Sequence, residues 1–100
     1  TAANNDDFTL SGADRNGNIF GEDPNLTFSV GDKIDFIVNS PSHPFYLKTV
    51  AGIGIAYNIS GVSNNGATQD TISWTPKIKG TYYYQCRFHQ GMSGTITIND

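Results

Sequence analysis

Three residues whose side chains bind metals lie at regular spacing near the C-terminal end of the chain. Cys86, His89 and Met92 are three residues apart in turn; Cys86 ends an expected strand over residues 81–86, and the other two follow it. On a loop that leaves a strand, this spacing lets a thiolate, an imidazole nitrogen and a thioether face one metal ion. Soft sulfur suits Cu(I) and imidazole suits Cu(II), so a mixed site can hold copper in either state.

A second imidazole is needed to complete a trigonal ligand set, and the chain has only one other histidine, His43. It follows an expected strand over residues 33–39 and precedes the apolar residues 45–47, so neighbouring strands could present it to the same loop. Cys86 is the only cysteine; it therefore forms no internal disulfide, and its thiol is buried, reactive or metal-bound.

The same three residues also fit other chemistries. His43, Cys86 and His89 together match a known ligand set of catalytic zinc, which, unlike Cu(II) bound to thiolate, would be colourless. A cysteine hydrolase is the less favoured alternative, because no acidic or amide residue is placed to orient the histidine. Tyr82 and Tyr84 share a face with Cys86 on the expected strand, which predicts packing roles for them.

Apolar residues recur at every second position, which predicts a mostly β protein. Gly31-Asp32 predicts a tight turn between two strands, Asn16-Gly17 predicts a hairpin turn, and residues 51–69, with four glycines, predict a long irregular excursion with room for one helical turn. The expected strands begin at Phe8 to Leu10 and then cover residues 26–30, 34–38, 45–50, 71–75, 81–86 and 94–98. Seven to eight short strands are typical of a β-sandwich.

Length and charge limit the function classes. A chain of 100 residues predicts one domain, 1–100, and it contains no apolar run of the roughly 18 residues that a membrane span needs. Its net charge is −3 with no run of basic residues, so nucleic-acid binding is excluded.

The chain begins at Thr1 without an apolar leader, which predicts a mature form. We expect an extracytoplasmic monomer (periplasmic, cell-surface or secreted), with an anchor in the precursor as an alternative.

A wider pattern connects these residues. His43-Pro44-Phe45, followed some forty residues later by Tyr84-Gln85-Cys86-x-x-His89-x-x-Met92, resembles the plastocyanin-like cupredoxins, which are type 1 (blue) copper proteins. Residues 26–36 resemble the family's paired strands before the first ligand, and residues 93–98 its last strand. The short spacing between the last three ligands is similar to that of amicyanin.

This resemblance implies a Greek-key β-sandwich that binds one copper ion, cycling between Cu(II) and Cu(I). It implies His43, Cys86 and His89 as equatorial ligands and Met92 as a weak axial ligand, with water as the axial alternative. The function implied is that of a one-electron carrier rather than an enzyme. The alternative is an open copper site that binds or oxidises a small molecule such as nitric oxide.

One residue near the sulfur departs from the family pattern, and a second is expected to compensate for it. Family members usually have Asn after the first histidine, and its backbone N–H donates to the thiolate, but Pro44 has no N–H. We expect the backbone N–H of Phe88 to take over this role.

The resemblance also implies brief docking with a redox partner protein, because small contacts dissociate fast enough for repeated turnover. We expect His89 to reach the surface and pass the electron. The apolar rim expected around it for docking consists of Pro44, Phe45, Phe88, Gly91 and Met92.

Overall fold

The computed structural model describes residues 1–100 and consists of eight strands joined by turns and loops. The prediction of an all-β fold with seven to eight strands is confirmed. No helix capable of crossing a lipid bilayer is present. The strands are β1 (Thr9–Asp14), β2 (Gly17–Glu22), β3 (Leu26–Ser29), β4 (Ile34–Asn39), β5 (Phe45–Lys48), β6 (Gln69–Trp74), β7 (Gly80–Cys86) and β8 (Ser93–Asn99).

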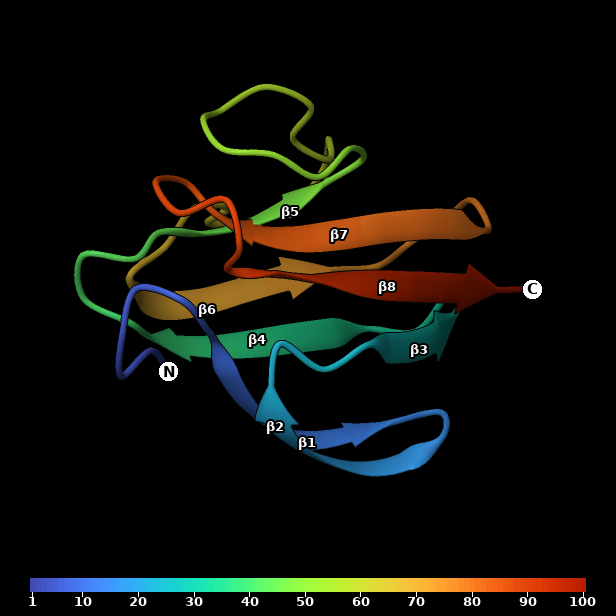
Figure 1. Ribbon diagram of the computed structural model, residues 1–100. Helices are drawn as coiled ribbons and strands as arrows, with labels where there is room; N and C mark the ends of the chain where they lie inside the picture. The colour runs from blue at the N-terminus through green and yellow to red at the C-terminus, as the bar shows by residue number, and fades with distance from the viewer.

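The strands form two packed layers and a separate hairpin (Figure 1). One layer is a four-stranded sheet in the order β3-β8-β7-β5, in which β3 runs parallel to β8 and the other neighbours are antiparallel. The other layer is the antiparallel pair β4-β6. Buried side chains from both layers belong to one hydrophobic cluster, so the two layers enclose a common core.

Alternating side chains on β4 and β6 supply one side of this core. Ile34 and Val38 point inward from β4, Ile72 and Trp74 from β6, and the residues between them are more exposed. Because strand side chains alternate between faces, every second residue at the C-terminal end of β6, and likewise Ile96 and Ile98 on β8, enters the interior. Each buried aliphatic or aromatic side chain contributes roughly 1.5–3 kcal/mol to folding relative to an exposed one.

Three local expectations need correction. The Gly31-Asp32 turn is present, but the two strands that it joins are not paired with each other as the family resemblance implied. Instead β3 pairs with β8 and β4 pairs with β6, so the turn connects the two layers. Residues 51–68 are irregular as expected, yet they contain no helical turn. The first hairpin turns at Arg15-Asn16, one residue earlier than expected, and its second strand β2 was not among the expected strands. Its signal is weak because Phe20 points into solvent, 84% exposed.

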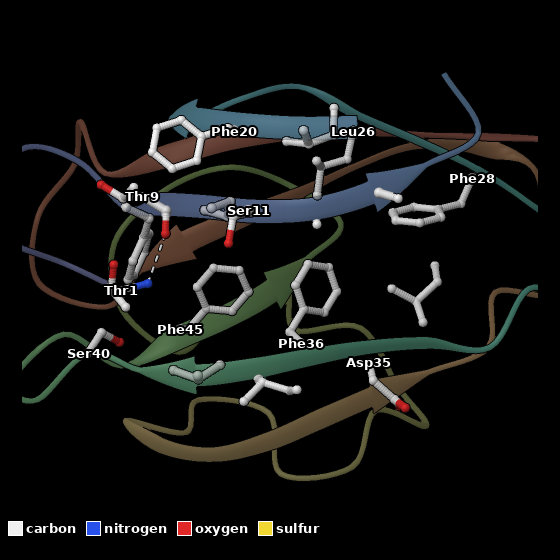
Figure 2. A pocket seen from close by; sticks show the side chains of 18 residues that line it. Thr1, Thr9, Ser11, Phe20, Leu26, Phe28, Asp35, Phe36, Ser40 and Phe45 are labelled. Carbon is white, nitrogen blue, oxygen red and sulfur yellow. Dashed lines mark hydrogen bonds between the residues drawn. The ribbon is translucent and has the colours of Figure 1, made fainter. Parts of the chain in front are cut away.

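A groove of about 480 Å³ separates the β1–β2 hairpin from β4 (Figure 2). Its lining is mainly apolar and includes Phe28, Phe36 and Phe45. β1 pairs only with β2, and β4 pairs only with β6, so no backbone ladder closes the sheet across the groove. The hairpin therefore lies beside the sandwich rather than completing its smaller layer.

Tyr84 fixes the packing between the two central strands of the larger sheet. Its ring stacks on Phe45, with centroids 5.3 Å apart and 11° between the planes, and its hydroxyl donates to the Pro24 carbonyl at 2.6 Å. Gly94 lies directly opposite Tyr84 on β8. A Cβ atom at this position would overlap the tyrosine ring, so the sheet requires glycine there.

Gly94→Ala is therefore expected to destabilise the fold by about 1–3 kcal/mol. The added methyl group would displace the Tyr84 ring, which is fixed by its stacking on Phe45 and by the bond from its hydroxyl to Pro24. The matched control is Gly91→Ala, because a Cβ atom added at Gly91 would have no other atom within 4 Å. This control should change the free energy of unfolding by no more than about 0.5 kcal/mol. Urea denaturation of the metal-free proteins measures both; equal stabilities of the two variants would contradict the packing described.

Candidate metal centre

The pairing of β5 with β7 brings the first histidine to the cysteine. In this antiparallel pair Phe45 lies opposite Cys86, the last residue of β7. His43 precedes Phe45 by two residues and so lies beyond the same end of the sheet. His89 and Met92 lie on the short loop that connects β7 to β8.

The predicted ligand atoms converge at this end. Cys86 Sγ lies 3.4 Å from His89 Nδ1 and 3.8 Å from His43 Nδ1. The ligand atoms of the three side chains all lie within 4.8 Å of one another, and the two imidazole centroids are 5.0 Å apart. Residues 43 positions apart in sequence thus present one sulfur and two nitrogens to a common point.

These separations fit a single bound metal ion. A metal that bonds sulfur at about 2.3 Å and imidazole nitrogen at about 2.0 Å, as zinc does, places the two atoms roughly 3.5–3.8 Å apart when they subtend about 110–120°. The two observed sulfur-to-nitrogen distances, 3.4 and 3.8 Å, lie at or close to this range. One thiolate with two imidazoles is also the donor mixture that suits copper in both oxidation states.

The three side chains differ in their access to solvent. Cys86 is fully buried and His43 is 8% exposed, whereas His89 is only partly buried. A buried thiol is shielded from oxidants and from exchange with other thiols. His89 is therefore the one candidate ligand through which the centre reaches the surface.

Backbone hydrogen bonds hold the β7–β8 loop closed. The Cys86 N–H donates to the Met92 carbonyl at 2.8 Å, and the Met92 N–H donates to the His89 carbonyl at 3.1 Å. The Arg87 N–H donates to the Pro44 carbonyl at 3.2 Å, which ties the loop to the segment that carries His43. Met92 is fully buried beside the other three residues; its thioether as an axial ligand stays a prediction.

Ser40 supports the first histidine, and its role was not predicted from the sequence. Its buried hydroxyl donates to the His43 carbonyl at 2.8 Å, while the His43 N–H donates to the Ser40 carbonyl at 2.9 Å. Ser42, between them, has a positive φ of 69°. The pattern Ser-x-x-His was the only available signal, and short serine-bonded turns are too common for it to be specific.

Two expectations about the surroundings of the site are wrong. Phe45 is 4% exposed, because its register opposite Cys86 turns it into the core, and Met92 is also buried. Neither can line an exposed rim, which is reduced to Phe88, Gly91 and the half-buried Pro44. The backbone N–H of Phe88 does not donate to Cys86 Sγ; the contacts of this sulfur with hydrogen-bonding groups are the two imidazole nitrogens.

Among solved structures, that of a proline-to-alanine mutant of amicyanin in its oxidized state is similar to this chain. The sequences are 25% identical, the match covers 76% of this chain and 70% of the other, and the TM-score is 0.48. No protein-family model and no curated protein matches the chain.

Ser40→Ala should loosen His43, because it leaves a buried carbonyl without its donor. We expect the free energy of unfolding of the metal-free protein to fall by about 1–3 kcal/mol. Copper affinity should weaken roughly tenfold, as for other residues that orient a ligand. Ser60→Ala, at an exposed loop position, is the matched control. Chelator competition and urea denaturation measure the two effects, and wild-type values of both for Ser40→Ala would contradict this role.

Proposed function

We propose that the protein is a cupredoxin-like one-electron carrier in which His43, Cys86 and His89 hold a single copper ion. The observation that carries this proposal is the convergence of one buried sulfur and one imidazole nitrogen from each histidine, which all lie within 4.8 Å of one another. Bound copper would supply the chemistry of taking up and releasing one electron at this point. Met92, buried next to these residues, is proposed as a weak axial ligand.

The chain's own residues suit a carrier in three ways. Cys86 has no exposed surface, so its thiolate is kept away from water and other thiols. The donor atoms already lie at bonding separations, so little rearrangement is needed when the metal changes its charge. The loop that carries His89 is closed by backbone hydrogen bonds, which holds the imidazole in place.

His89 is the proposed exit for the electron, because it is the least buried of the three ligand residues. The surface beside it carries Phe88, 58% exposed, and the exposed Gly91. A small apolar surface of this kind supports brief docking with a redox partner, since contacts of limited area separate quickly. The proposed working location is extracytoplasmic, which is supported by the sequence resemblance to cupredoxins.

Copper-loaded, oxidised protein is expected to absorb visible light intensely and to be paramagnetic, because Cu(II) bonded to a thiolate has both properties. Cys86→Ser should lose the strong absorption, since the sulfur is the source of the colour. Visible absorption and electron paramagnetic resonance of the two proteins test this expectation. A colourless wild-type protein that instead holds zinc tightly would favour the zinc alternative.

Phe88→Glu is expected to slow electron self-exchange between oxidised and reduced copies at least several-fold, because it places a charge on the apolar surface beside His89. Phe20→Glu is the matched control: it adds the same charge at a side chain that is 84% exposed, on the β1–β2 hairpin. The rates can be measured by NMR line broadening in mixtures of the two redox states. Equal rates for the two variants would remove the Phe88 surface from consideration.

A further inference from the structure

Two polar side chains are buried on the outer face of the larger sheet, away from the hydrophobic core. Lys48 on β5 is 1% exposed and Gln85 on β7 has no exposed surface. Leu47 and Cys86, their neighbours in sequence, point into the core, so the alternation of the strands places the polar pair on the opposite face. The irregular segment 51–68 follows β5 (Figure 1), and its residues Gly52 and Gly54 bond to these two side chains.

The Gln85 amide is bonded to both loops that meet there. The two hydrogens of its Nε2 are shared among three carbonyl oxygens, those of His89 at 2.8 Å, Cys86 at 3.1 Å and Gln90 at 3.2 Å. Its Oε1 accepts the N–H of Gly52 at 3.2 Å. One buried side chain therefore contacts three carbonyl groups of the proposed metal-binding loop and also links that loop to Gly52 of the 51–68 segment.

Lys48 bonds to the same part of the 51–68 segment from β5. Its Nζ donates to the carbonyls of Gly52 at 2.7 Å and Gly54 at 3.1 Å. The Gly54 N–H in turn donates to the Arg87 carbonyl at 2.8 Å, inside the proposed metal-binding loop. The ion pairs of the structure, Arg15 with Asp32 and Lys79 with Asp100, do not include Lys48. Burial lowers the pKa of its ammonium group.

A buried ammonium paired only with carbonyl groups, and a buried amide, both carry a desolvation cost that their hydrogen bonds must offset. No buried side-chain nitrogen or oxygen in the structure lacks a partner. The carbonyls that accept the Gln85 bonds belong to Cys86 and His89, two of the proposed ligand residues, and to their neighbour Gln90. The contacts therefore fix the shape of the loop between Cys86 and Met92 from its outer side.

We propose that Gln85, supported by Lys48, is a positioning residue for the metal centre. Its amide bonds to carbonyls of the loop that carries the Cys86 sulfur and the His89 imidazole. These bonds hold the two groups at the separation they need to bind one metal ion, before the metal arrives. It also couples that loop to the Gly52–Gly54 turn. The inference rests on the proposed copper function, but the coupling between the two loops is measurable in the metal-free protein.

The test compares Gln85→Leu with Gln90→Leu, which makes the same change at an exposed side chain of the same loop. In the metal-free proteins, hydrogen exchange followed by NMR should show the Gly52 and Gly54 amides exchanging about tenfold faster or more in Gln85→Leu only. The amide of Ile96, in the core of β8, should keep its protection, which shows that the sheet is intact.

With Cu(II) added, Gln85→Leu should bind about tenfold more weakly or worse in chelator competition, while Gln90→Leu keeps wild-type affinity. If wild type binds copper, an unchanged affinity or an unchanged exchange rate for Gln85→Leu overturns the positioning role. If wild type binds no copper, the proposed function fails, and the exchange rates alone decide whether Gln85 couples the loops. Should Gln85→Leu not fold, Gln85→Asn, whose shorter amide cannot span both loops, is measured instead with the same expectations.

Discussion

The antiparallel register of β5 on β7 is the constraint on which the candidate centre depends. With Phe45 opposite Cys86, the segment that carries His43 is brought beside the end of β7. A shift of one residue would reverse the faces of β5, exposing Phe45 and moving His43 away from the sulfur. Aromatic packing protects the register, because the Phe45 ring stacks on Tyr84 and makes an edge contact with Phe8.

The two faces of the larger sheet have different roles. The inner face buries the apolar core together with the Cys86 thiol, so the sulfur is removed from water by the residues that stabilise the fold. The outer face buries Lys48 and Gln85, whose donors satisfy the carbonyls of two irregular loops. Irregular backbone near a buried site must find such partners, since unpaired carbonyls are costly to bury.

The strands and the ligand residues could be predicted from the sequence because they depend on local patterns. Alternation identified every strand except β2, and the Cys-x-x-His spacing identified two of the three residues that converge at the candidate site, Cys86 and His89. The β2 strand was missed because its side chains are mostly exposed, which leaves little alternation to detect.

Contacts between distant segments could not be predicted in the same way. The burial of Phe45 follows from its register with Cys86, and the role of Gln85 depends on its contact with Gly52, 33 residues away in the sequence. The expected bond from the Phe88 N–H to the sulfur failed for the same reason, since the direction of one N–H depends on loop geometry. Ser40 acts through a turn whose sequence is common in proteins.

A crystal structure of the copper-loaded protein, with the metal located by its anomalous scattering, tests the central claim most directly. One copper ion should lie within roughly 2.0–2.3 Å of Cys86 Sγ, His43 Nδ1 and His89 Nδ1 together. Copper bound elsewhere, or bound at Cys86 and His89 with the His43 ring turned away from it, would contradict the account.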